Sequence, residues 1–369
     1  MTPVLAVPDP SALPAPAGLL AALHLLTLGL HLAAMGALVG GAVTATAVRG
    51  PAVFARPAVR RLLRGLPVAM AATVSLGVAP LLFLQLSYGR VVYAAAVASA
   101  VPFVLVPLLA MTAYACLHGA ARATATARGA SVRLHVALAG MVAVGATFGS
   151  TFALAERPDL VAATYARTAS GWALHPEPLV WVPRAVQTLA AAAALGAFLA
   201  RRLARGDEVV RDAGLRVLRG TARLASVAGL ARLALDARLA GALGASGVVL
   251  HVVGATAPFA ASVLVARTAR PDAVAGTVLV VGLFAAVVAR HLARLGTLEG
   301  VFSPSDAPVQ PQWGAFAVFV VALVGAATTI TAMLRAWARA PAGPAGPGGA
   351  PDGTRSSAPS AEPSSAQAS

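Results

Sequence analysis

An uncharged, apolar stretch from Gly18 to Val48 constrains the fold of this chain more than any other feature of its sequence. About 20 consecutive apolar residues already allow an α-helix to cross the hydrocarbon core of a bilayer. The rest of the chain has the same character, because 58% of the 369 residues are hydrophobic and 11% are charged. Soluble domains carry roughly 25% charged residues. The sequence therefore predicts an all-α fold, a polytopic transmembrane helical bundle.

Further apolar stretches follow the first, and together they predict about nine membrane spans. Their expected bounds are 18–48, 66–87, 91–117, 132–154, 180–200, 220–242, 245–266, 273–296 and 314–335. Arginines concentrate in alternate connections, and the positive-inside rule places those connections in the cytoplasm. This arrangement predicts that the N-terminus lies outside and the C-terminus inside.

The same reading divides the chain into three parts. Residues 1–17 are expected to form a lead-in, residues 18–335 the transmembrane helical domain, and residues 340–369 a disordered cytoplasmic tail rich in Pro, Gly, Ala and Ser. The 201–219 connection is amphipathic and predicts a helix on the cytoplasmic surface.

The net charge and the cysteine content limit which partners and cofactors the chain can have. The net charge is +15, and every basic side chain is arginine. In a membrane protein the orientation of the loops explains such a charge, so we expect no nucleic-acid partner. The expected partner is the lipid bilayer and the expected location is the bacterial inner membrane. Cys116 is the single cysteine, which excludes an intrachain disulfide and a Cys-x-x-Cys-His haem attachment.

Polar side chains inside the predicted spans gather near the outer surface. His24 and His31 are seven residues apart, so on a helix they share a face at a spacing of about 10.5 Å. Ionisable groups within spans are costly and by default mark a functional cavity or an ion pair. The others that fall in outer halves or at outer ends are Glu156, Arg157, Arg184, Gln187, Arg232, Asp236, His251, Arg290, His291 and Arg294.

Two kinds of site fit these side chains. Imidazoles on different helices can bind the iron of a b-type haem while arginines face its propionates. In that reading His31 and His251 are the preferred axial pair and His24 is an alternate ligand. The same residues could instead hold a quinone headgroup, with Glu156 as a proton acceptor. The expected cofactor-binding set is His24, His31, Gln187, His251, Arg290, His291 and Arg294.

Polar contacts between helices are the simpler alternative for each residue taken singly. Arginines near a helix end can extend their charged heads to the interface while their stems stay among apolar side chains. For the cluster as a whole, the gathering of so many groups at one surface favours a site.

The chain resembles bacterial membrane proteins that oxidise quinol and hold haem b, and in particular the large subunit of cytochrome bd-type oxidases. The resemblance rests on three stretches within the first two hundred residues. These are His24 and His31 followed by Gly40 and Gly41, then TFGSTFALAERP at 147–158, and VPRAVQ at 182–187. It implies haem b and a quinone as cofactors.

The chain also departs from that family at three points. Gln187 stands where the family would have a histidine, residues 241–246 replace a large outer quinol-binding loop, and the Gly-Arg-Gln-Pro-Trp element is missing. The resemblance therefore predicts a diverged redox subunit that passes electrons to a periplasmic cytochrome or to other redox subunits. The alternatives are a secondary transporter of a small anion, with Arg232 and Arg290 as counter-charges, and a non-catalytic membrane anchor or assembly protein.

Overall fold

The computed structural model describes residues 12–49, 53–122, 127–167, 170–204, 206–267 and 271–339. The predicted tail, 340–369, and most of the predicted lead-in lie outside these residues. The described part is all-α apart from one isolated β-bridge, which confirms the predicted fold class.

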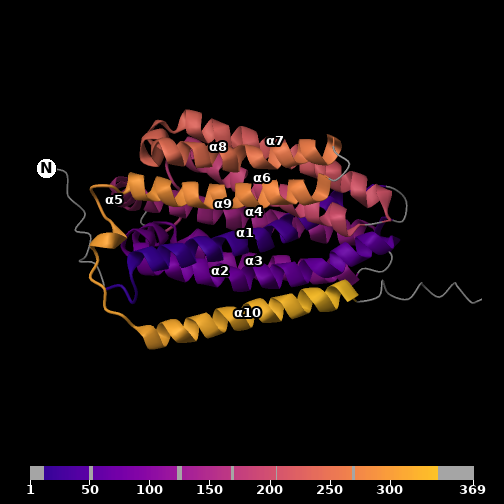
Figure 1. The fold of residues 1–369 in the computed structure, drawn as a ribbon, viewed down its shortest axis with the longest axis horizontal. Helices are drawn as coiled ribbons and strands as arrows, with labels where there is room; N and C mark the ends of the chain where they lie inside the picture. The colour runs from indigo at the N-terminus through magenta and orange to yellow at the C-terminus, as the bar shows by residue number, and fades with distance from the viewer. Residues whose placement is uncertain are drawn as a thin grey trace, which may run out of the picture.

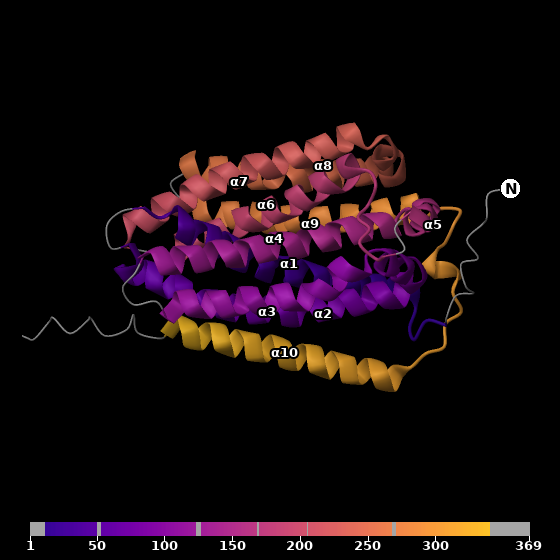
Figure 2. The ribbon, with the colours of Figure 1, turned by 180° about the vertical axis from the view of Figure 1, so that it is seen from behind.

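Ten α-helices make up this part of the chain, and the long ones lie side by side in one bundle (Figures 1 and 2). In chain order they are α1 (Ala17–Ala47), α2 (Pro57–Ala98), α3 (Ala100–Arg122), α4 (Ala127–Ala155), α5 (Pro158–Arg167), α6 (Pro178–Leu203), α7 (Glu208–Leu235), α8 (Ala237–Arg267), α9 (Pro271–Thr297) and α10 (Trp313–Arg339). The short helix α5 lies at one end of the bundle (Figure 1). Two 3₁₀ turns, η1 (Val53–Ala55) and η2 (Pro304–Asp306), lie in connections.

Eight of these helices are long and apolar enough to cross a membrane, namely all except α5 and α7. Helix α7 carries several arginines, but it lies alongside α6 and α8 in both views (Figures 1 and 2). Its first half buries Val210, Ala213 and Leu218. The predicted surface helix at 201–219 is therefore wrong: residues 208–219 begin a long helix that is packed into the bundle.

Two predicted turns are kinks inside helices. The second and third spans were expected to separate at 88–90, but α2 continues to Ala98 and only Tyr88 leaves helical geometry (φ −130°, ψ 16°). The sixth and seventh spans were expected to separate at 241–246. Instead α7 ends before Asp236, and Gly244 (φ 62°) forms a kink inside α8. Polar residues and glycines suggested turns there, whereas the packing of the bundle keeps the chain helical.

Helices α1 and α6 approach each other closely through glycines. A Cβ atom on Gly40 would overlap the backbone of α6 at Ala193, and one on Gly196 would overlap the backbone of α1 at Gly36. Small residues at a helix interface allow this approach and give van der Waals contact that lipid cannot supply. The glycine face of α1 thereby fixes the helix against α6, while its histidine face turns toward other neighbours.

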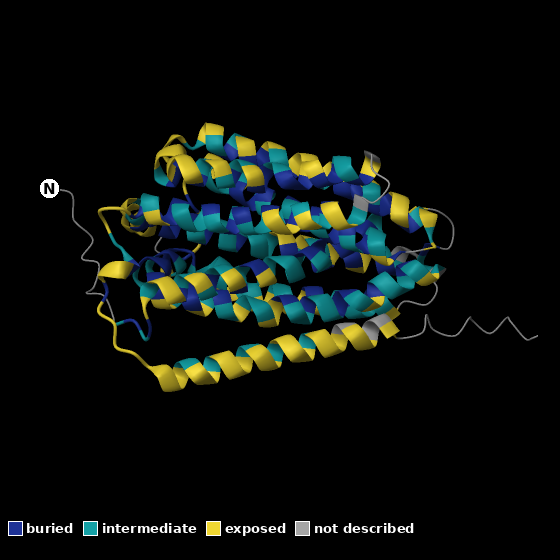
Figure 3. Ribbon diagram, viewed as in Figure 1, coloured by how far each residue is buried: buried dark blue, intermediate teal, exposed yellow. Residues whose placement is uncertain are grey.

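Helix α10 lies apart from the other helices and is exposed over most of its length (Figure 3). The ring of Phe319 on α10 contacts that of Phe83 on α2 edge to face, with centroids 4.9 Å apart. The connection that precedes α10 pairs with the lead-in: Leu13 N donates to the Pro308 carbonyl at 2.8 Å, and Gln310 N donates to the Leu13 carbonyl at 2.9 Å.

We expect Gly196→Ala to lower the midpoint of thermal unfolding of the detergent-purified chain. The added methyl group must push α1 and α6 apart, and overpacking of this kind costs about 1–3 kcal/mol. The matched control is Gly220→Ala on α7, where no heavy atom lies within 4 Å of an added Cβ. Equal midpoints for the two variants would contradict the close packing of α1 on α6.

Candidate functional site

A buried carboxylate at one end of the bundle joins three helices. Glu156 follows the last residue of α4, and Arg184 of α6 donates to both its oxygens, at 2.5 and 3.0 Å. Arg294 of α9 places its Nε 3.4 Å from Glu156 Oε1. All three side chains are buried. Charge-assisted, bidentate pairs of this kind are strong and geometrically specific.

Two further arginines make this end of the bundle strongly positive. Arg232 of α7 is 5% exposed, and its Nε has no hydrogen-bond partner. Arg290 of α9 donates to Thr188 Oγ1 at 2.6 Å. These four arginines outnumber the carboxylates that act on them, Glu156 and the more distant Asp236. Buried charge without a counter-charge is costly, so the arrangement favours anionic groups nearby.

An aromatic side chain completes the cluster. The guanidinium carbon of Arg294 lies 5.2 Å from the centroid of the Tyr88 ring, within the range of a cation–π interaction. Tyr88 is the residue at which α2 kinks, so the kink brings its ring to the arginine.

A cavity of about 470 Å³ lies beside this cluster. Its wall is largely apolar and comes from α1, α2, α3, α4, α6 and α9. Ligand pockets in proteins typically measure 300–1,000 Å³ and combine apolar walls with a few polar groups. The polar or ionisable side chains that line it are His24, His31, Thr73, Arg184, Thr188, Arg290 and Arg294. We call this space the larger cavity.

Both histidines of α1 are held in the wall of the larger cavity by backbone carbonyls of α2. His24 Nδ1 donates to the Pro80 carbonyl and His31 Nδ1 to the Thr73 carbonyl, each at 3.0 Å. This leaves Nε2 of each ring as the nitrogen available to a ligand. Metal-binding histidines are typically oriented in this way by a hydrogen bond from the other ring nitrogen.

Gly77 of α2 makes room for the His31 ring. A Cβ atom at this position would come within 2.9 Å of the imidazole. Only glycine allows the ring to lie against α2 and keep its hydrogen bond to the Thr73 carbonyl.

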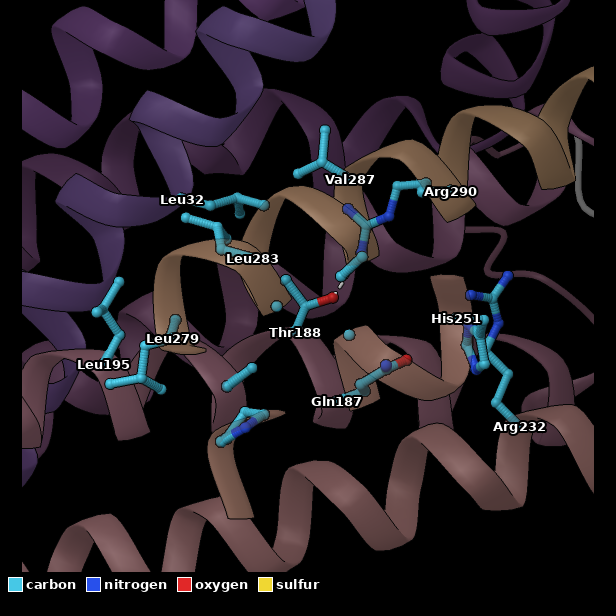
Figure 4. Close-up of a pocket in the computed structure, with 16 residues that line it drawn as sticks. Leu32, Gln187, Thr188, Leu195, Arg232, His251, Leu279, Leu283, Val287 and Arg290 are labelled. Atoms are coloured by element: carbon cyan, nitrogen blue, oxygen red, sulfur yellow. Dashed lines mark hydrogen bonds between the residues drawn. The ribbon is translucent and has the colours of Figure 1, made fainter. Parts of the chain in front are cut away.

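A second space, of about 60 Å³, lies between α1, α6, α7, α8 and α9 (Figure 4). We call it the smaller cavity. Its polar side chains are Gln187, Thr188, Arg232, His251 and Arg290. His251 Nε2 donates to the Gly229 carbonyl at 2.9 Å, which fixes the ring and leaves Nδ1 as an acceptor.

The connection after Glu156 covers this end of the bundle. Arg157 binds Asp159 and Glu177, at 2.7 and 3.2 Å. His175 N donates to Ser150 Oγ at 2.8 Å, and Glu177 N donates to His175 Nδ1 at 3.0 Å. Burial lowers the pKa of His175, so the ring is neutral at pH 7. The connection is therefore tied to α4 and α6 rather than extending freely.

The structure divides the expected site residues between the two cavities. The larger cavity takes His24, His31, Arg290 and Arg294, and the smaller takes Gln187, His251 and Arg290. His31 and His251, the expected haem-ligand pair, do not line one common cavity. His291 lines neither, and its Nδ1 is buried without a hydrogen-bond partner.

Some contacts differ from those that the sequence suggested, and others were not expected. Arg232 and Asp236 are four residues apart, but they form no ion pair within 4 Å, because Asp236 follows the end of α7 and its side chain accepts from Arg238 N. The carbonyl partners of the histidines and the role of Gly77 were missed, because backbone groups of another helix leave no signal in the sequence. Within the described residues, no three His, Cys, Asp or Glu side chains are grouped to hold a metal ion.

Comparison with solved structures shows which fold this is. The chain resembles a chain in "The structure of bd oxidase from Geobacillus thermodenitrificans", with a TM-score of 0.55 and 14% sequence identity. The match covers 87% of this chain and 98% of that chain. At this identity it shows a shared fold, and it extends well beyond the first two hundred residues. No protein-family model and no curated protein sequence matches the chain.

We expect Glu156→Gln to destabilise the chain strongly, because it leaves Arg184 and Arg294 buried without their counter-charge. Removing one partner of a buried ion pair costs about 3–5 kcal/mol. The control is Asp159→Asn, whose side chain is 59% exposed and whose ion pair contributes little. Thermal unfolding in detergent measures both, and similar midpoints would contradict the role of Glu156.

Proposed function

We propose that this chain is a membrane subunit of a redox complex of the bd-oxidase type, and that it holds a haem b in the larger cavity. The observation that supports this most is the pair of histidines, His24 and His31, each fixed through Nδ1 on the wall of a cavity of about 470 Å³. The shared fold with a bd oxidase chain supports the same class of function.

The residues of the larger cavity fit a haem in three respects. The imidazole of His31 would bind the iron through Nε2, and His24 is the alternate ligand. Met35 and Met70 line the same cavity, and thioethers are common second ligands to haem iron. Arg290 and Arg294 supply positive charge for propionates. When bound, the haem supplies one-electron redox chemistry.

The second expected ligand, His251, belongs to the smaller cavity in this proposal. A space of about 60 Å³ does not hold a macrocycle, and Gln187 in its wall is not a usual haem ligand. The proposal therefore places the haem at His31 and not between His31 and His251. It requires no terminal oxidase site in this chain.

A quinone is the proposed electron partner on the membrane side, with its headgroup near the arginine cluster. Two arginines stabilise the carboxylate of Glu156, which makes its protonation costly. We therefore propose that Glu156 positions Arg184 and Arg294.

The proposed topology has nine crossings, with α7 as the ninth. Its arginines Arg211 and Arg216 lie in the first third of the helix, which begins at the end of the bundle opposite α5, and Arg219 and Arg223 lie near its middle. The arginine-rich connections then lie in the cytoplasm and the arginine–glutamate cluster near the periplasm. We place the chain in a bacterial inner membrane, with a periplasmic cytochrome or other redox subunits as partners.

Loss of the haem on replacing His31 tests this proposal. We expect the purified chain to show the dithionite-reduced minus oxidised spectrum of a b-type haem, and His31→Ala to lose or shift it. His135→Ala is the control, because His135 is exposed and bonds only within its own helix. A purified chain with no b-type absorbance would overturn the haem assignment and favour a non-catalytic anchor.

A subtler change at Gly77 separates ligation from folding. Gly77→Ala is expected to displace the His31 ring and shift the haem absorbance or lower haem occupancy, because the methyl group occupies the place of the imidazole. Gly220→Ala is again the control. An unchanged spectrum and haem content in Gly77→Ala would show that His31 is not the ligand.

A further inference from the structure

The smaller cavity contains two guanidinium groups and no carboxylate. Only 5% of the Arg232 surface is exposed, and its Nε lacks a hydrogen-bond partner. Arg290 makes one hydrogen bond within the described residues, to Thr188 Oγ1. Neither guanidinium forms an ion pair within 4 Å among the described residues. Glu156 is bonded to Arg184 and Arg294 and acts on Arg232 and Arg290 only at longer range, as Asp236 does on Arg232.

One neutral side chain of the smaller cavity, Gln187, adds hydrogen-bond donors to this positive charge. The hydroxyl of Thr188 already donates to the Arg184 carbonyl, and His251 Nε2 donates to the Gly229 carbonyl. Gln187 and Thr188 line this cavity together with the two arginines, and His251 lies beside Arg232 (Figure 4). The amide of Gln187 donates hydrogen bonds through its nitrogen. Gly229 leaves the space for this amide, since a Cβ there would come within 2.7 Å of Gln187 Nε2. The chain thus keeps a space open beside the Gln187 amide, with Arg232 and Arg290 in its wall.

We propose that the smaller cavity binds a small monovalent anion, of the size of chloride, nitrate or formate. Arg232 is buried and Arg290 is partly buried, and neither forms an ion pair, so an anion beside them removes part of the cost of keeping both charges away from water. At about 60 Å³, against about 470 Å³ for the larger cavity, this space favours a small ion over a haem or a quinone ring. The site goes beyond the proposed redox function and lies in a different cavity from the haem.

The test is thermal unfolding of the full-length purified chain at constant ionic strength. Chloride, nitrate or formate replaces gluconate stepwise, because gluconate is too large for the cavity. We expect at least one of the three to raise the unfolding midpoint of the wild-type chain in a saturable manner. Equal midpoints in all four salts would overturn the proposal and leave water as the occupant.

Variants assign the effect to the site. Arg232→Gln is expected to abolish the saturable shift, and Arg232→Lys to weaken it, because lysine keeps the charge but not the guanidinium geometry. Arg238→Gln is the control, since Arg238 is exposed at the start of α8. A shift that persists unchanged in Arg232→Gln would place the anion elsewhere and contradict the proposal.

A second measurement does not depend on the folding of any variant. Binding of chloride to the wild-type chain is expected to broaden the ³⁵Cl resonance, and nitrate or formate should reverse the broadening by competition. If chloride binding causes no broadening, and neither nitrate nor formate raises the unfolding midpoint, the site is refuted. The haem spectrum recorded on the same sample reports separately on the larger cavity, so either proposal can fail alone.

Discussion

The ion pairs of Glu156 with Arg184 and Arg294 are the interaction on which this end of the structure depends. They tie the end of α4 to α6 and α9, and two further arginines, Arg232 and Arg290, lie near the cluster. A single carboxylate cannot compensate this charge. The structure is consequently poised to attract anionic groups into the two cavities beside the cluster, and both proposals about function start from that imbalance.

Helix α1 links this electrostatic arrangement to the packing of the bundle. One of its faces carries Gly36 and Gly40 and lies directly on α6, while the other presents His24 and His31 to α2 and the larger cavity. Close packing on one side and cavity formation on the other use the same helix. A rigid placement of α1 therefore also fixes the two imidazoles.

Much of the fold could be predicted from hydropathy, because a span must be long and apolar to cross a bilayer. The bounds of α1, α6 and α9 fall within a few residues of those expected. The errors are at Tyr88, at Gly244 and in the first half of α7, where local polarity suggested a turn or a surface. Packing against neighbouring helices decides those places, and a single sequence does not reveal it.

The sequence predicted that these polar residues lie near one another, but it did not predict which of them contact each other. The gathering of charged residues at one end followed from alternating spans, and the structure brings Glu156, Arg290 and Arg294 to the same end of the bundle. The division of His31 and His251 between two cavities depends on which faces of α1 and α8 meet other helices. Periodicity within one helix does not contain that information.

The central claim is that His31 binds a haem in the larger cavity, and an electron cryo-microscopy map of the purified full-length chain in nanodiscs tests it most directly. The account predicts density for a macrocycle between α1, α2, α4 and α9, continuous with the His31 imidazole. Density for an acyl chain in that cavity, or a cavity filled by collapsed side chains, would contradict it.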